Sequence, residues 1–184
     1  MKKLALISLL FSPALWAFSA TDLVEAGRSQ IGQTRYYDPA YSKLSYPMGD
    51  VPLVKGVCTD VVIRALRGQK MDLQQLIHED MAKHFKHYPK IWGLKTTDRN
   101  IDHRRVPNIE TYFKRQGYQL KNQPYQAGDI VTWNLPKGLT HIGILSDKTN
   151  QAGQPLVIHN IGSGTQEEDL LHKYPIRYHF RIKG

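Results

Sequence analysis

The side chains in this 184-residue sequence best suited to nucleophilic chemistry are one cysteine, Cys58, and two histidines far downstream, His141 and His159. Cys58 is the single cysteine of the chain, so it has no intramolecular partner for a disulfide. A thiolate attacks a carbonyl carbon efficiently when an imidazole takes its proton and another polar group orients that imidazole. A free cysteine also packs well as a small buried hydrophobic residue. The residue types therefore indicate acyl transfer, with an inert buried thiol as the competing interpretation.

Cys58 begins a predicted helix that runs to Arg67, with Gly68 as its C-terminal stop. The free backbone N–H groups of a helix start favour a negative charge and lower the pKa of a thiol there. Val62 and Leu66 follow at helical spacing, so Cys58 shares the face that packs on the rest of the domain. The position suits a nucleophile and a structural thiol equally.

The two histidines belong to a predicted hairpin: one strand begins at His141 and the next contains His159. A loop centred near Asn150 pairs Ile144 with Leu156 and His141 with His159. Directly opposed residues have Cβ atoms about 5 Å apart. We therefore expect the two imidazoles side by side, one accepting the thiol proton and the other orienting it.

The remaining pattern predicts helices first and antiparallel strands afterwards, which is an α+β layout. The expected helices are 21–33, 58–67, one beginning near 72, and 108–116. The expected strands are 129–133, 141–146, 156–161 and 177–182.

The N-terminus resembles an export signal. Lys2 and Lys3 precede an apolar run, and small residues surround Ser19, after which we expect cleavage. The apolar run is too short to serve as a membrane-spanning helix, and no later segment is long enough. These features predict a signal peptide over 1–19, a single domain over 20–184, and a periplasmic or secreted protein without a transmembrane segment.

The composition fits a folded, basic domain, with 41% hydrophobic residues and a net charge of +9. Without Lys2 and Lys3 the 25 basic residues become 23 against 16 acidic ones, a net charge of +7. This charge favours attraction to anionic surfaces. The basic residues are scattered rather than aligned, which argues against specific nucleic-acid binding.

Several motifs together resemble a known superfamily. A cysteine opening a helix, then GDIVTW (128–133), then HIGILSD beginning at His141, then a strand ending in His159, is similar to the NlpC-type, papain-like cell-wall cysteine peptidases. The motifs CTDVVIRAL, HEDM, IDHRRVPN, GDIVTW and HIGILSD more closely resemble a bacterial domain-of-unknown-function family placed near that superfamily. The likeness spans roughly residues 21–162.

The resemblance implies a papain-like fold and hydrolysis of peptide bonds in peptidoglycan stems. It implies Cys58 as nucleophile, His141 as base and His159 as orienting residue, with Tyr46 as the counterpart of an aromatic residue near the oxyanion region. The chain departs from the common pattern at Thr59, where many members have serine, and in a helical or irregular insertion over about 72–108. These departures concern substrate choice more than chemistry.

Three other side chains are candidates for substrate binding. Arg104 and Arg105 can bind a carboxylate through the two-pronged guanidinium, and Trp92 can line a groove. The competing interpretation of the arginines is a structural ion pair, with Asp60, Asp102 or Glu79 as partner. For Trp92 the competing interpretation is core packing.

A histidine-rich stretch around His78 invites a metal interpretation. No histidine lies four residues after His78, so the zinc spacing of HExxH is absent. We expect no metal and no cofactor. The sequence as a whole predicts an exported cysteine hydrolase acting on peptidoglycan or peptides, and the alternative is a non-catalytic envelope-binding module on the same fold.

Overall fold

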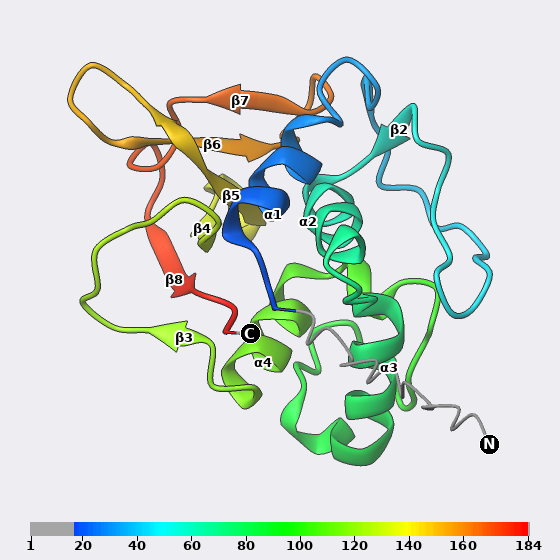
Figure 1. Cartoon of the computed structure of the whole chain (residues 1–184). Coiled ribbons are helices and arrows are strands. Elements are labelled where there is room, and N and C mark those ends of the chain that lie inside the picture. The colour runs from blue at the N-terminus through cyan, green and yellow to red at the C-terminus, as the bar shows by residue number, and fades with distance from the viewer. Residues whose placement is uncertain (1–16, 184) are drawn as a thin grey trace, which may run out of the picture.

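The computed structural model describes residues 17–183, in which four α-helices pack with an antiparallel six-stranded sheet (Figure 1). The helices are α1 (Ala20–Arg28), α2 (Cys58–Gly68), α3 (Leu73–His84) and α4 (Val106–Arg115). The strands are β1 (Tyr36–Tyr37), β2 (Lys55–Gly56), β3 (Gln119–Leu120), β4 (Ile130–Asn134), β5 (Thr140–Thr149), β6 (Pro155–His159), β7 (Gln166–Glu168) and β8 (Ile176–Phe180). Short 3₁₀ helices lie at Phe85–His87, Asp102–Arg104 and Pro136–Gly138. The predicted α+β class is confirmed at this level.

The large sheet has the strand order β3-β8-β4-β5-β6-β7, and each neighbouring pair within it is antiparallel. Helices α1 and α2 cover one face of the sheet in Figure 1. Alternate strand residues such as Ile142, Ile144 and Ile158 share the main core with these helices. The other face carries a second apolar cluster that includes Trp133 and Leu145. The sheet therefore separates two cores.

The helix ends differ from the predicted ones. α1 begins at Ala20, because the Ser19 side chain caps it by accepting a hydrogen bond from the backbone N–H of Asp22 at 3.1 Å, and it ends at Arg28, before the predicted residue 33. α2 begins at Cys58, as predicted, and extends through Gly68. Asp72 caps α3 rather than forming its first residue.

The predicted hairpin register between β5 and β6 is wrong by two residues. Ile144 pairs with Ile158, not with Leu156. The reason is the turn: the side chain of Asn150 accepts hydrogen bonds from the backbone N–H groups of Ala152 and Gln154, which moves the turn centre toward Ala152. A shift of two residues preserves the alternation of faces. His141 and His159 thus stay on one face, as diagonal rather than opposed neighbours.

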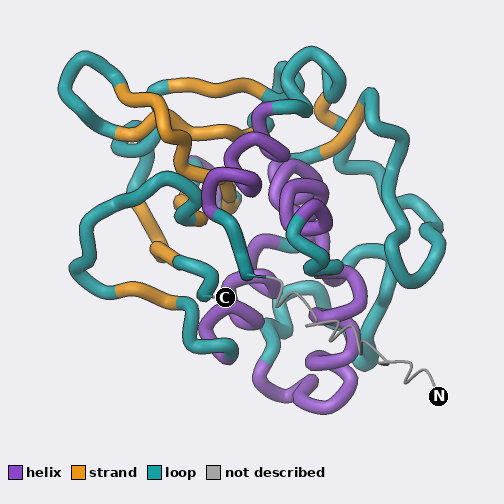
Figure 2. The backbone as a smooth tube through the Cα atoms, in the orientation of Figure 1, coloured by secondary structure: helices purple, strands orange, loops and turns teal. Residues whose placement is uncertain are grey.

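The segment expected as an insertion, about 72–108, contains α3, two of the 3₁₀ helices and the start of α4. In Figure 2, loops and turns connect these helices to one another and to the rest of the chain. The first 16 residues of the expected export signal lie outside the described residues. Within residues 17–183 none of the helices has the length and apolar character needed to cross a membrane.

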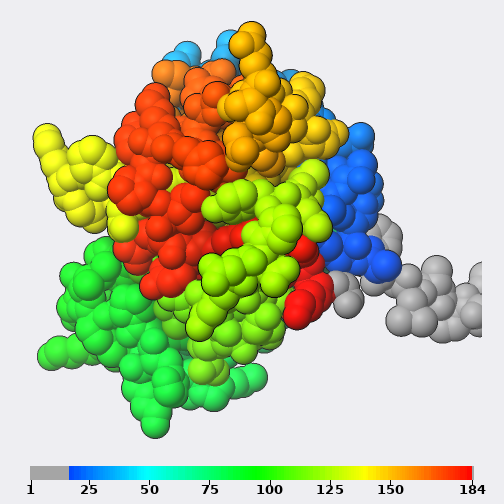
Figure 3. Space-filling view, turned by 90° about the vertical axis from the view of Figure 1, so that its left-hand side faces the viewer, coloured from blue at the N-terminus to red at the C-terminus, as the bar shows by residue number. Residues whose placement is uncertain are grey.

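The side of the molecule in Figure 3 presents β8 and the chain that follows α4. Beneath it, the buried Asp129 carboxylate accepts a hydrogen bond from Arg181 Nε at 2.6 Å and lies 2.6 Å from Nε2 of His179. Asp129 therefore holds the end of β8 to β4 and has a structural role.

Candidate functional site

A buried carboxylate positions the start of α2. Asp60 Oδ2 accepts a hydrogen bond from the backbone N–H of Val57 at 2.7 Å, which closes the first turn around Cys58. Both Asp60 oxygens also accept hydrogen bonds from Arg104, each at 2.9 Å. The preceding residues 55–56 form β2, which pairs with β1 and fixes the chain that enters the helix. The geometry around Cys58 is therefore held from both sides.

The Cys58 thiol is buried, with 5% of the residue exposed. Removal from water raises the pKa of the thiol to about 12, although backbone N–H groups of Ile142, Thr59 and Cys58 itself oppose the rise by stabilising the thiolate. Two of these N–H groups belong to the helix start, and that of Ile142 belongs to β5. The resting thiol is protonated, and the surrounding backbone N–H groups can donate hydrogen bonds to the thiolate.

The two histidines are brought together by three neighbouring strands. His141 pairs in register with Trp133 of β4, and their rings lie 5.8 Å apart. On the other side, Nε2 of His141 lies 3.1 Å from Nδ1 of His159. Gly143 makes room for this contact, since a Cβ there would come within 3.2 Å of the His159 Cβ. The predicted neighbourhood of the two imidazoles is present, despite the different register.

Both rings are buried and neutral. Desolvation and the neighbouring His159 lower the pKa of His141 to about 3, and desolvation also lowers the pKa of His159. On its far side, Nε2 of His159 lies 3.3 Å from a carboxylate oxygen of Glu168 in β7. Glu168 was not among the sequence candidates, because it lies in a short polar strand with no periodicity to indicate its contact.

The thiol faces the beginning of β5. Its contact with the Ile142 N–H places it directly beside the residue that follows His141. Nδ1 of His141 has no hydrogen-bond partner among residues 17–183, Cys58 included, and the residue is 1% exposed. Cys58 and His141 are therefore related through the backbone of β5 at Ile142 and not by a direct hydrogen bond.

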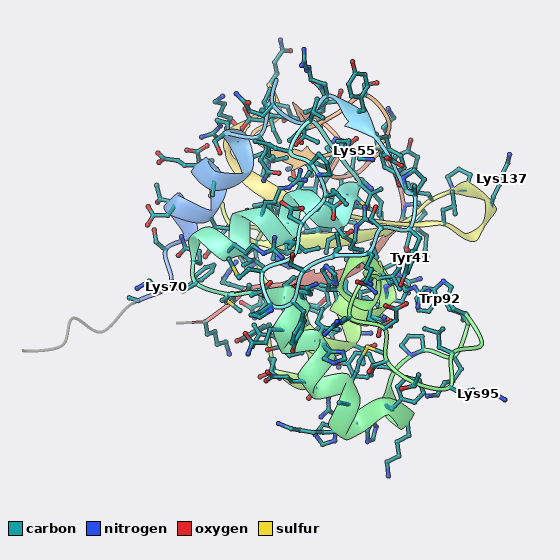
Figure 4. The ribbon with its side chains drawn as sticks, turned by 90° about the vertical axis from the view of Figure 1, so that its right-hand side faces the viewer. Tyr41, Lys55, Lys70, Trp92, Lys95 and Lys137 are labelled. Carbon is teal, nitrogen blue, oxygen red and sulfur yellow. The ribbon has the colours of Figure 1, made fainter. Side chains whose placement is uncertain are left out.

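Cys58 opens into a cavity of about 330 Å³, here called the Cys58 cavity. This volume is near the lower end of the range for small-molecule sites. Its lining residues are Tyr37, Pro39, Val57, Cys58, Trp92, Ile101, Arg104, Arg105, Val106, Pro107, Leu139 and Thr140. Figure 4 shows the loops carrying Trp92 and Lys137 projecting on one side of the molecule, with Tyr41 between them. The cavity lies between these loops, since Trp92 and Leu139 contribute to its wall.

The expectation for Tyr46 is not met. Its ring packs on His78, with centroids 5.2 Å apart, and beneath Arg99, and it does not line the Cys58 cavity. Tyr37 lies there instead, because β1 pairs it with Gly56, two residues before Cys58. Burial raises the pKa of Tyr37 to about 12, with the charge of the neighbouring Cys58 thiolate as a further cause. A two-residue strand has no sequence periodicity, so no signal pointed to Tyr37.

The cavity wall includes Arg104, Arg105 and Trp92, and the two arginines differ in their contacts. Arg104 is occupied by Asp60 in a pair whose side chains are 2% and 3% exposed. This is the structural ion pair left open by the sequence, and it removes Arg104 as a free carboxylate binder. Arg105 also forms an ion pair anticipated from the sequence, with Asp102 at 3.3 Å, and in addition it stacks on Trp92, with its guanidinium carbon 4.2 Å from the ring centre.

The histidine-rich stretch has separate contacts. His78 packs on Tyr46, and His84 and His87 lie edge to face with ring centres 6.2 Å apart. Nε2 of His84 lies 3.9 Å from Asp80. In the part of the chain that the structure describes, no three side chains of histidine, cysteine, aspartate or glutamate form a metal-binding group.

Acid should destabilise the protein through two buried histidines. Burial lowers the pKa of His103 to about 4 and that of His141 to about 3, from 6.5. As pH falls below 6.5 the unfolded chain binds protons that the folded chain excludes, so the free energy of unfolding falls until the folded pKa is reached. The slope should approach about 1.4 kcal/mol per pH unit for each histidine. Urea unfolding between pH 7 and 4 measures it.

Matched variants separate these contributions. His103→Gln and His141→Gln should each give a shallower pH dependence of the free energy of unfolding than the wild type. His172→Gln, at an exposed position, should leave it unchanged. A slope equal to that of the wild type in both buried-site variants would contradict the burial of neutral imidazoles.

The fold and site define a mixed α+β protein with a buried thiol at a helix start and a buried histidine pair on two neighbouring strands. The domain-of-unknown-function family DUF1287 matches residues 24–182, and the chain belongs to this family. A relative from Escherichia coli (strain K12), named "Uncharacterized protein YijF", is 57% identical over 166 residues, which cover 86% of this chain and 80% of that protein. The predicted resemblance to a domain-of-unknown-function family is thereby confirmed.

Proposed function

We propose that this protein is an exported, papain-like cysteine hydrolase that cleaves amide bonds in peptidoglycan stem peptides. The observation that carries the proposal is the 3.1 Å contact between His141 Nε2 and His159 Nδ1, beside the strand that meets the Cys58 thiol. An oriented imidazole next to a thiol at a helix start is the arrangement that nucleophilic catalysis uses. The peptidoglycan substrate rests on the resemblance to the NlpC-type peptidases.

One set of proton positions fits the line of side chains best. Nε2 of His159 lies 3.3 Å from Glu168 without the alignment of a hydrogen bond, and an ionised Glu168, which only accepts, favours the tautomer with the proton on Nε2 and Nδ1 as an acceptor. Nδ1 of His159 then accepts the Nε2–H of His141. This leaves the lone pair of His141 on Nδ1, the nitrogen without a partner. His141 is therefore set up as a base at the atom that remains available to Cys58.

In the proposed reaction, Nδ1 of His141 takes the thiol proton and Cys58 Sγ bonds to the amide carbon. The backbone N–H of Cys58 at the helix start donates to the oxyanion. Tyr37, kept protonated by its raised pKa, is a second donor in the cavity. His141 then gives its proton to the departing amine, leaving a thioester. A water molecule activated by His141 releases the acid and restores the thiol.

The test is digestion of purified sacculi. The wild-type protein should release soluble fragments whose masses identify the amide bond that is cleaved, and the Cys58→Ala protein should release none. Fragment release by the wild type and the variant at equal rates would refute the role of the thiol.

A second function, a non-catalytic binding module, is favoured by one observation. The raised pKa of Cys58 and the lowered pKa of His141 describe a neutral, unactivated pair in the empty site. A binding module predicts that Cys58 reacts with iodoacetamide at neutral pH no faster than a free thiol. It also predicts that muropeptides bind and remain intact.

A further inference from the structure

Arg105 is a charged side chain in the wall of the Cys58 cavity whose hydrogen-bonding capacity is mostly unused. Its side chain is 16% exposed, and within residues 17–183 it makes one side-chain hydrogen bond, from Nη1 to Asp102 Oδ1 at 3.3 Å. A guanidinium offers five N–H donors. Nε and Nη2 therefore have no partner among the described residues, although burial disfavours the charge and lowers the pKa of Arg105.

The other arginine of the cavity provides an internal comparison. Arg104 donates to both oxygens of Asp60 and to the carbonyl oxygens of Ala40 and Asp38. Its charge is neutralised and its donors are used. None of the lining residues of the Cys58 cavity is acidic. The charge of Arg105 is paired with Asp102, which lies outside the lining, but the edge that carries its Nε and Nη2 has no acidic partner in the cavity wall.

Stacking determines how Arg105 can bind a ligand. The Trp92 ring covers one face of the guanidinium, at 4.2 Å from ring centre to Cζ. A cation–π contact uses the face and leaves the N–H groups at the edge free. An edge with two parallel donors matches the two oxygens of a carboxylate. A single fork among apolar residues such as Ile101, Val106 and Leu139 suits a small monoanion better than a doubly charged phosphate.

We propose that Arg105, held flat by Trp92, is a carboxylate-binding subsite of the Cys58 cavity. In terms of the proposed function, on which this inference rests, the preferred substrate carries a free carboxylate close to the amide bond that Cys58 attacks.

Alkylation of Cys58 tests the subsite without a known substrate. Iodoacetate and iodoacetamide react identically, the thiolate forming a bond to the CH₂ carbon as iodide leaves, but only iodoacetate carries a carboxylate. The iodoacetate rate divided by the iodoacetamide rate should fall about tenfold in Arg105→Gln, the factor expected for a lost charge-assisted hydrogen bond. Arg105→Lys, which keeps the charge without the fork, should give an intermediate ratio.

Arg99→Gln is the matched control, because it removes a positive charge from a side chain that lies on Tyr46 and outside the cavity. Its ratio of iodoacetate rate to iodoacetamide rate should equal that of the wild type, because any change in the thiolate fraction cancels from the ratio. An unchanged ratio in Arg105→Gln would overturn the inference.

A second measurement does not depend on a reactive thiol. In the Cys58→Ala protein, N-acetylglycine should shift the indole N–H resonance of Trp92 in NMR spectra, whereas N-acetylglycinamide should not. Arg105→Gln should abolish the shift. Equal responses to acid and amide, or no response to either, would overturn the subsite. An unreactive Cys58 combined with carboxylate binding would refute only the proposed hydrolase.

Discussion

Hydrolysis by the Cys58→Ala and His141→Ala proteins should fall to background, a loss of about a thousandfold or more. The first variant lacks the proposed nucleophile, and the second lacks the proposed base, whose Nδ1 has no hydrogen-bond partner among the described residues. His159→Ala should lose less, because water can replace part of its contact with His141. Glu168→Gln should lose about tenfold, since its carboxylate fixes the proton positions but is half exposed. Release of sacculus fragments over time measures all four.

The order of these four losses of activity distinguishes an effect on catalysis from a general loss of structure. Each variant should keep the far-UV circular dichroism spectrum of the wild type. His172→Ala, at an exposed position, should retain full activity. Equal losses in His159→Ala and His141→Ala would contradict the assignment of separate roles. Full activity in His141→Ala would remove it as the base.

Breaking the Asp60–Arg104 pair should cause the largest loss of stability in the protein. Replacing Arg104 by methionine leaves a carboxylate that is buried without its countercharge, which typically costs about 3–5 kcal/mol of the free energy of unfolding. Chemical denaturation at pH 7 measures the loss.

The more exposed ion pair between Arg115 and Asp80 provides a matched control for the buried pair. The side chain of Arg115 is 27% exposed, so Arg115→Met should cost much less of the free energy of unfolding than Arg104→Met. The double variant Asp60→Asn/Arg104→Met should recover part of the loss, because no unpaired charge remains. A cost for Arg104→Met equal to that of Arg115→Met would show that the buried pair contributes no more than a surface pair.

The elements that hold Cys58, His141 and His159 were predictable because periodicity and capping are local signals. A helix beginning at Cys58 and strands at His141 and His159 follow from the spacing of apolar residues and a period of two. Their register was not predictable from the same signals. It depends on hydrogen bonds of the Asn150 side chain within the turn.

The residues that sequence reasoning missed or misplaced depend on contacts between distant segments. Tyr37 reaches the cavity through a two-residue strand, and Tyr46 is held elsewhere by His78. The carboxylate of Glu168 meets His159 only because β7 is added at the sheet edge. Arg104 and Arg105 are adjacent in sequence but have different partners, because Asp60 lies against Arg104. No local pattern encodes these choices.

The line from His141 through His159 to Glu168 crosses the sheet from β5 to the outer strand β7. Glu168 is 49% exposed there, whereas Cys58 opens into the cavity, whose lining does not include His141. A ligand that fills the cavity therefore leaves the Glu168 end of the line exposed to solvent.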